Sequence, residues 1–161
     1  MLWRVPASLL IVMVGWWFFV RPMNVLGDWV DVPQEFALCS DRGSGTAGCV
    51  VDGDTVIIGF GQQRRRIRLT GFDAPELEGA CPAESKSAIT ARDALHDWLA
   101  QGAFEWSGGN DPAYDKYGRE LREVRRATVN GRYEYLSETM IDRKLASESG
   151  WDAWPNDWCN Q

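Results

Sequence analysis

Three carboxylates and two arginines occur in an order that suits chemistry on a phosphodiester. Asp54 precedes one alternating apolar and polar stretch, Asp73 and Glu76 follow a second stretch that contains Arg68, and Arg119 lies further along. Asp54 and Asp73 offer hard oxygen ligands, which suit Ca²⁺ or Mg²⁺ rather than zinc. Arginines bind phosphate through paired donors. Together with a divalent cation they stabilise the charge that builds up when a phosphodiester is attacked.

Two predicted strands bring these groups together. The alternation over residues 55–60 and 65–69 predicts a pair of half-buried strands, and residues 61–63 are expected to form the hairpin loop between them. If the strands pair antiparallel, the carboxylates before the first strand and after the second return to one edge of the sheet. Glu76 follows Asp73 by three residues in a proline-containing turn, from which it could reach a water molecule near a metal ion.

The remaining chain predicts two helices and further short strands. A helix over residues 82–101 has a proline in its first turn and a glycine just after it, and residues 133–146 show a second helical pattern. Strands are expected at 104–106 and near 121–128. The apolar side chains expected on the core face of the first helix are Ala88, Ala91, Leu95, Trp98 and Leu99. The expected fold is α+β and mostly β: a five-stranded OB-type Greek-key barrel with two helices, preceded by an N-terminal transmembrane helix.

The beginning of the chain is strongly apolar. Residues 5–20 carry no charge and lie between Arg4 and Arg21. A bilayer span needs about 20 apolar residues, although roughly 17 can suffice. Aromatic residues stand near the end of this run, where a cleavage site would need small ones, so an uncleaved anchor is expected and a cleaved signal peptide is the alternative. The expected organisation is a membrane anchor or signal segment at 1–27, a spacer at 28–35 and the OB-fold domain at 36–161.

Four cysteines in an exported chain favour two disulfides. Of the three possible connectivities, the expected one joins Cys39 to Cys49 and Cys81 to Cys159. Closing the long second loop would contribute about 4 kcal/mol in the chain-entropy model. A cysteine metal site is not indicated, because no C-x-x-C spacing occurs and the only histidine is remote.

The charge is unevenly distributed along the chain. A net charge of −6 and a pI near 4.8 argue against broad attraction to polyanions. Basic residues nevertheless gather in two clusters, which are Arg64, Arg65, Arg66 and Arg68, and Lys116, Arg119, Arg122, Arg125 and Arg126. Such a locally basic face could bind phosphate, and a solvated strand face is the alternative.

Three motifs resemble the staphylococcal nuclease (thermonuclease-like) family. They are V-V-D-G-D-T from residue 50, R-L-x-G-F-D-A-P-E from residue 68 and D-K-Y-G-R-x-L from residue 115. They occur in the family's order with similar separations, and the resemblance covers roughly residues 50–146. It implies an OB barrel with helices and calcium-dependent hydrolysis of the phosphodiester bonds of DNA and RNA.

The resemblance also implies a role for each site residue. Ca²⁺ would be held by the carboxylates of Asp54 and Asp73 and by the backbone carbonyl of Ala74. The family's phosphate-binding arginines, which are expected to be catalytic, fall on Arg68 and Arg119. The remaining assignments are the catalytic general base Glu76 and the substrate-binding residues Lys116 and Tyr117.

The expected protein is thus a hydrolase of the thermonuclease type that acts as a monomer. Its partners would be DNA and RNA as substrates and the membrane through the N-terminal helix. It would be a single-pass protein of the cell membrane with an extracytoplasmic nuclease domain, or a secreted or periplasmic one after signal cleavage. A non-catalytic OB-fold module that binds single-stranded nucleic acid is the alternative. The enzyme is favoured because the three carboxylates and both arginines are all present.

Overall fold

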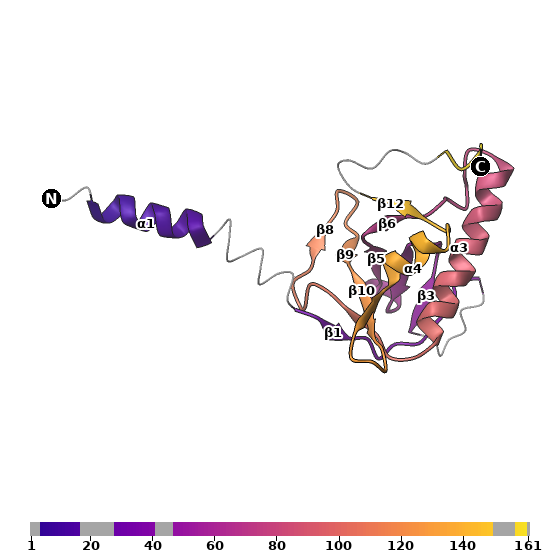
Figure 1. The fold of residues 1–161 in the computed structure, drawn as a ribbon, viewed down its shortest axis with the longest axis horizontal. Coiled ribbons are helices and arrows are strands. Elements are labelled where there is room, and N and C mark those ends of the chain that lie inside the picture. Colours follow the sequence, from indigo (N-terminus) through magenta and orange to yellow (C-terminus); the bar gives the residue numbers. More distant parts are fainter. Residues whose placement is uncertain (1–3, 17–27, 41–46, 150–156, 161) are drawn as a thin grey trace.

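The computed structural model describes residues 4–16, 28–40, 47–149 and 157–160. Within them lie three α-helices, one 3₁₀ turn and twelve strands (Figure 1). The helices are α1 (Arg4–Gly15), α3 (Pro82–Ala100) and α4 (Leu136–Asp142), and the 3₁₀ turn is η2 (Gly61–Gln63).

The strands form three sheets. The six-stranded sheet has the order β2 (Phe36–Leu38), β3 (Gly48–Val50), β4 (Thr55–Ile58), β5 (Arg65–Leu69), β9 (Glu120–Arg122) and β8 (Ala113–Tyr114). The four-stranded sheet has the order β1 (Val30–Asp31), β7 (Glu105–Trp106), β10 (Val124–Ala127) and β11 (Tyr133–Tyr135). The two-stranded sheet pairs β6 (Phe72–Asp73) with β12 (Ser147–Glu148).

The predicted hairpin is confirmed. β4 and β5 pair antiparallel with Thr55 opposite Arg68, and η2 connects them. The pairing continues beyond the strands, because the N–H of Leu69 donates to the carbonyl of Asp54 at 2.7 Å. The start of β4 and the end of β5 therefore lie at the same edge of the sheet.

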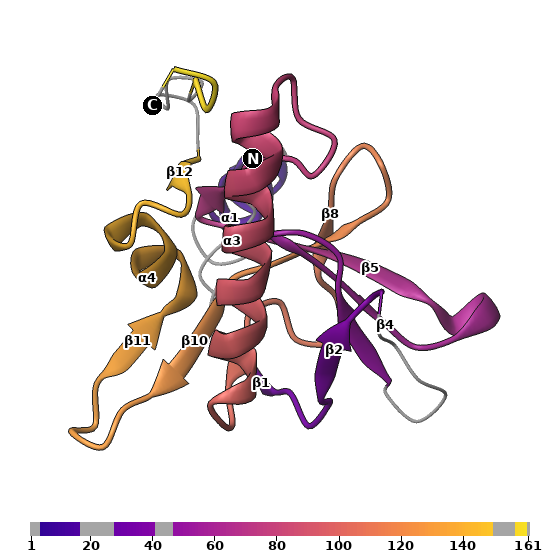
Figure 2. The same cartoon turned by 90° about the vertical axis from the view of Figure 1, so that its right-hand side faces the viewer.

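Helix α3 is also confirmed, and it covers the core. Its buried side chains are Ala88, Ala91, Ala94, Leu95, Trp98 and Leu99, of which only Ala94 was not expected. Figure 2 shows α3 running between the β4–β5 hairpin on one side and β10 and β11 on the other. Trp98 is almost fully buried, packs edge-on against Phe104 and donates its indole N–H to Glu134 at 2.8 Å. Burying a large apolar side chain contributes about 1.5–3 kcal/mol, so this helix face is a main source of stability.

The second helix is shorter than expected. The helical pattern was read over residues 133–146, but residues 133–135 form β11 and pair with β10. Hairpin pairing with the preceding strand here outweighs local helical spacing. Helix α4 ends soon after Asp142, since Lys144 has a φ of 58°. Leu136 and Met140 of this helix are buried in the core.

The predicted closed barrel of five strands is wrong. The six-stranded sheet ends at β2 and β8, which do not pair with each other, and the other described strands belong to separate sheets. The single strand expected near 121–128 is divided between two sheets. After β9, which pairs with β5, the chain crosses to the other sheet at Glu123. There the N–H of Glu123 donates to Ser107 Oγ at 2.8 Å, and the N–H of Ser107 donates to the carbonyl of Glu123 at 2.9 Å. The fold is α+β, mostly strands, with sheets that do not close.

The predicted transmembrane helix is not found among the described residues. Helix α1 has 12 residues, which span about 18 Å, whereas the hydrocarbon core of a bilayer is about 30 Å thick. Among the described residues, none of the helices is both long and apolar enough to cross a membrane. The end of the predicted span, residues 17–20, lies outside the described residues.

The segment expected to be a spacer contributes to the domain. β1 pairs antiparallel with β7, and the N–H of Val32 donates to the carbonyl of Phe104 at 3.0 Å. The Val32 side chain is buried in the core. Trp29 packs on the guanidinium of Arg125, whose Cζ lies 3.8 Å from the ring centroid. Residues 28–35 are therefore held to the four-stranded sheet.

The expected disulfide connectivity is confirmed. Cys39 is joined to Cys49, and Cys81 is joined to Cys159. The first disulfide links residues near the parallel strands β2 and β3, whereas the second connects the start of α3 to the C-terminal segment (Figure 1). The two bonds close loops of very different length, with sequence separations of 10 and 78 residues.

We predict that the two disulfides stabilise the domain unequally. The chain-entropy model gives about 4.5 kcal/mol for the loop closed by Cys81 and Cys159 and about 2.7 kcal/mol for the shorter loop. Replacing both cysteines of each pair by serine should therefore cost about 2 kcal/mol more for the longer loop. Urea unfolding of the two double variants measures the difference. Equal costs would show that the tail attachment does not restrict the unfolded chain as the model requires.

Candidate functional site

Asp54 is a buried carboxylate at the start of β4. Its side chain is 2% exposed and makes an ion pair with Arg68, with Oδ1 2.7 Å from Nη1. The hydroxyl of Thr55 donates to Oδ1 at 3.0 Å, and the N–H of Ala74 donates to Oδ2 at 3.1 Å. One carboxylate thereby connects β4, β5 and the turn that follows β6.

Arg68 lies between the two predicted metal ligands. Its Nη1 contacts Asp54, and its Nη2 donates to Oδ1 of Asp73. Asp73 is the outer partner, with a side chain that is 53% exposed. β12 covers the other side of this turn, because Ser147 pairs with Asp73 and donates its hydroxyl to the Asp73 carbonyl at 3.4 Å. The structure thus brings both predicted ligands to a single guanidinium.

Further carboxylates crowd this position. Burial raises the pKa of Asp54 to about 7, against the effect of Arg68, and the charge of Asp52 adds to the increase. The carboxyl group of Glu76 is partly desolvated although the residue is exposed, and this raises its pKa, with Asp52 as the next cause. Asp52 is itself oriented by the N–H of Asp54, which donates to its Oδ1 at 3.1 Å. Both shifts are caused mainly by desolvation, and the charge of Asp52 adds to each of them.

Arg119 is positioned by Asp115. Oδ2 of Asp115 lies 2.7 Å from Nε of Arg119, while Oδ1 accepts the N–H groups of Tyr117 at 2.8 Å and Arg119 at 2.9 Å. Desolvation acts in the opposite direction, but these hydrogen bonds lower the pKa of Asp115. The ion pair uses only Nε, so within the described part of the chain the two Nη nitrogens of Arg119 have no hydrogen-bond partner.

These groups meet at an open cleft of about 440 Å³. Its walls include Arg68, Glu76, Arg119 and Tyr117, which come from β5, the turn after β6 and the loop before β9. All three predicted catalytic residues therefore line one cavity. Ser149, just beyond β12, also lines it.

The other predicted residues lie around this cleft rather than in its wall. Asp54 and Asp73 reach it through their contacts with Arg68. Ala74 is buried, with its N–H directed at Asp54. Lys116 is exposed, and its Nζ lies 4.9 Å from the ring centroid of Tyr117. The predicted set is thus one neighbourhood with Arg68 at its centre.

Sequence reasoning assigned no role to two acids that organise the site. Asp115 accepts N–H groups two and four residues ahead, which is the pattern of an Asx turn, and its place before a glycine-containing loop was a usable signal. Asp52 was recognised only as part of the V-V-D-G-D-T motif. Its influence on Glu76 depends on a distance across the fold, which no local signal shows, whereas Asp54 is only two residues away.

The carboxylates of Asp54 and Asp73 suit a hard cation, provided that the Arg68 guanidinium moves from between them. Asp54 and Asp73 already direct oxygens at one positive charge, which is the requirement for Ca²⁺ coordination by carboxylates. A cation between them would take the place of the Arg68 guanidinium. The described residues contain one group of three acidic or sulfur ligands within 4.8 Å, namely Cys81, Glu84 and Cys159, and its sulfurs are joined in a disulfide. That group is not a calcium site.

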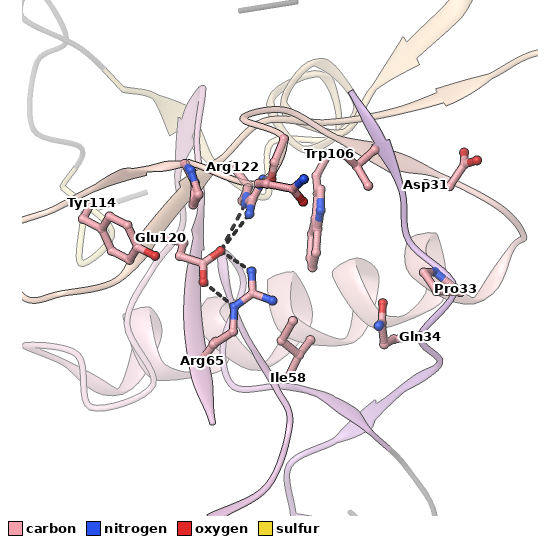
Figure 3. Close-up of a pocket in the computed structure, with 13 residues that line it drawn as sticks. Asp31, Pro33, Gln34, Ile58, Arg65, Trp106, Tyr114, Glu120 and Arg122 are labelled. Carbon is pink, nitrogen blue, oxygen red and sulfur yellow. Dashed lines mark hydrogen bonds and ion pairs between the residues drawn. The ribbon is translucent and has the colours of Figure 1, made fainter. Parts of the chain in front are cut away.

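A separate cavity, of about 340 Å³ and lined in part by Trp106, lies beside β5 and β9 (Figure 3). Figure 3 shows Arg65 and Arg122 both directed at Glu120. Nε and Nη2 of Arg65 and Nε and Nη2 of Arg122 all donate to this carboxylate. Nη1 of Arg122 donates to the carbonyls of Ser107 at 2.7 Å and Gly109 at 2.8 Å. The cluster ties β5, β9 and the loop after β7 together, so its role is structural.

Comparison with known proteins assigns no family, since no protein-family model matches the chain and no curated protein gives a significant match. The resemblance to the staphylococcal nuclease family stays a prediction that depends on its three motifs.

We predict that Glu120→Gln strongly destabilises the fold. Arg122 is 2% exposed and would be left without its carboxylate, a change that typically costs about 3–5 kcal/mol. Urea unfolding at pH 7 measures the loss. Glu78→Gln, at an exposed position, is the matched control and should change stability by less than about 0.5 kcal/mol.

The stability of the wild type and that of Glu120→Gln should also depend differently on pH in acid. Desolvation alone would raise the pKa of Glu120, but hydrogen bonds from Arg65 and Arg122 lower it below its ordinary value of 4.5. Its stabilising contribution is therefore complete above pH 4.5 and is lost as the pH falls through the lower, folded-state pKa. The wild type should lose stability over this range and Glu120→Gln should lose less. Parallel pH profiles would contradict the assigned pKa direction.

Proposed function

We propose that this protein is a nuclease that hydrolyses phosphodiester bonds of DNA and RNA in the presence of Ca²⁺. The observation that carries the proposal is the meeting of Arg68, Glu76 and Arg119 at one cleft from three separate segments. The three sequence motifs that resemble staphylococcal nuclease contain these same residues. The two disulfides favour an extracytoplasmic location, because such bonds persist in oxidising compartments.

The two arginines are suited to the phosphate. Arg119 is oriented through Nε by Asp115, and its Nη groups remain available as paired donors. Arg68 is held by Asp54 and Asp73 in the absence of substrate, so a phosphate would compete with the carboxylates for its donors. Fixed guanidinium groups stabilise the negative charge that grows on the phosphate oxygens during attack.

Glu76 is suited to act as the general base. Its carboxyl group lies at the cleft, and its pKa is raised by desolvation and by neighbouring acids, which makes the carboxylate a better proton acceptor near neutral pH. It would take a proton from the water that attacks phosphorus. The bond from phosphorus to the leaving oxygen then breaks, and its electron pair stays on that oxygen.

Asp54, Asp73 and the carbonyl of Ala74 would hold the cation. When bound, Ca²⁺ would supply positive charge against the phosphate oxygens and compensate the crowded carboxylates. Asp54 is well placed for this role, because the N–H of Ala74 and the hydroxyl of Thr55 already fix its orientation. Arg68 would then be free to bind the substrate phosphate instead of the two acids.

Binding without cleavage is the alternative function, since the same arginines would hold a phosphate in either case. The raised pKa of Glu76 favours the enzyme, because phosphate binding does not require a carboxylate beside the two arginines.

We predict that cleavage requires Ca²⁺. Activity on single-stranded DNA should be lost in a calcium chelator and restored by added Ca²⁺. Asp73→Asn removes one ligand from an exposed position and should raise the Ca²⁺ concentration needed for half-maximal activity by about tenfold or more. Asp97→Asn, on the exposed side of α3, is the control and should leave it unchanged. Full activity of the wild type in chelator would remove the cation from the proposal.

We predict different defects for the base and the arginine. Glu76→Gln should slow single-turnover cleavage by about 10²- to 10⁴-fold while oligonucleotide binding changes little. Arg119→Lys keeps the charge but loses the paired donors, so cleavage and phosphate binding should both weaken. Arg132→Lys, in the exposed turn between β10 and β11, is the matched control.

The outcome also separates the two functions. Unchanged cleavage by Glu76→Gln would exclude Glu76 as the base. A wild-type protein that binds oligonucleotides but cleaves none at any Ca²⁺ concentration would establish the binding module.

A further inference from the structure

We infer that a second cavity beside the cleft binds additional phosphates of the same single-stranded nucleic acid through Arg64 and Arg66. This inference deepens the proposed function and rests on it, because the cleft would hold the phosphate that is cleaved. The second cavity would hold neighbouring nucleotides and so lengthen the binding site along the strand.

The two cavities adjoin at Tyr117, which lines both. The second cavity has a volume of about 360 Å³ and is lined by Arg64, which follows η2, and by Arg65 and Arg66 at the start of β5. Tyr114 on β8 forms part of its wall. A strand that leaves the cleft past Tyr117 therefore meets this basic surface next.

Ion pairing divides the four clustered arginines into two kinds. Arg68 is paired with acids in the cleft, and Arg65 is paired with Glu120. Arg64 and Arg66 are exposed, and among the described residues neither has a carboxylate partner. Of these four arginines, Arg64 and Arg66 therefore remain available to a phosphate, on a chain whose net charge is −6.

The strand places the available cations in a row. Side chains alternate along β5, so the buried Ile67 and Leu69 face the core while Arg66 and Arg68 face the other side. Going back along the strand from Arg68, Arg66 comes next at a spacing of about 6.6 Å, and Arg64 lies one further step in the same direction, next to η2. The row begins in the cleft and leads away from it.

Two exposed aromatic rings indicate an unpaired strand rather than a duplex. Tyr114 is 59% exposed and Tyr117 is 71% exposed. Such rings can stack on bases only where the bases are not already paired and stacked in a helix. Glu120, the one acid of this cavity, does not oppose phosphate, because it lies between Arg65 and Arg122 (Figure 3).

The test compares a long and a short ligand. Fluorescence anisotropy in calcium chelator measures binding of a labelled thymidine octanucleotide to the wild type, Arg64→Gln, Arg66→Gln and the double variant. Each single change should lower affinity roughly tenfold at low salt, and the magnitude of the slope of log K against log[NaCl] should fall by about 0.7 per arginine removed. Arg132→Gln is the matched control, since the β10–β11 hairpin projects on the opposite side of α3 from the β4–β5 hairpin (Figure 2), and it should bind as the wild type does.

A dinucleotide fills the cleft alone, so its Ca²⁺-dependent cleavage should be the same in wild type, Arg64→Gln and Arg66→Gln. Equal loss for dinucleotide and octanucleotide would overturn the inference, since the arginines would then belong to the cleft. Unchanged octanucleotide affinity would overturn it as well. If the variants then lost binding to vesicles of anionic lipid instead, the two arginines would bind lipid headgroups and not nucleic acid. If the wild type cleaves neither ligand while the variants still lose octanucleotide affinity, the proposed hydrolysis fails and the binding surface stands.

Discussion

The ion pair between Arg68 and the buried Asp54 is the interaction on which the site depends. A carboxylate that is 2% exposed must be compensated, and Arg68 provides this from the adjacent strand. The remaining lone pairs of Asp54 accept the hydroxyl of Thr55 and the N–H of Ala74, so the turn after β6 is held against the start of β4. That turn carries Asp73 and Glu76. The hydrogen bond from Ala74 to Asp54 therefore helps to position Glu76, the candidate base, beside the proposed cation ligand.

A second constraint is the distribution of arginines on an acidic protein. Arg65 and Arg122 share the buried Glu120 and join β5 to β9, and Arg125 is held between Trp29 and Tyr133 with its Cζ 3.8 Å and 3.7 Å from their ring centroids. These cations serve the fold. Arg119 is held through one nitrogen only, while Arg64 and Arg66 have no acidic partner among the described residues. Arginines a few positions apart thus either stabilise the fold or stay available to a ligand, and their ion pairs show which do which.

Local patterns were sufficient for the elements that carry the site. The hairpin of β4 and β5, helix α3 and its buried face, and the pairing of the cysteines were all predicted correctly. Long-range strand pairing was not. The barrel was expected to close, but the hydrogen bonds between Glu123 and Ser107 divide the chain between two sheets. Residues sixteen positions apart make these bonds, and nothing in either local sequence specifies the partner. At β11 the competing interaction is local, since pairing with β10 across a short turn replaced the expected first turn of a helix.

The sequence by itself determined the types and order of the candidate site residues, because strand alternation and turn chemistry are encoded within a few neighbouring positions. It placed Asp54, Arg68, Asp73 and Glu76 near one sheet edge, and the structure brings them there. Only the tertiary structure decided that Arg68 lies between the two aspartates, and that burial, with Asp52 as a further cause, raises the pKa of both Asp54 and Glu76. These effects are electrostatic. They depend on distances and burial, which arise when separate segments pack and which no local pattern contains.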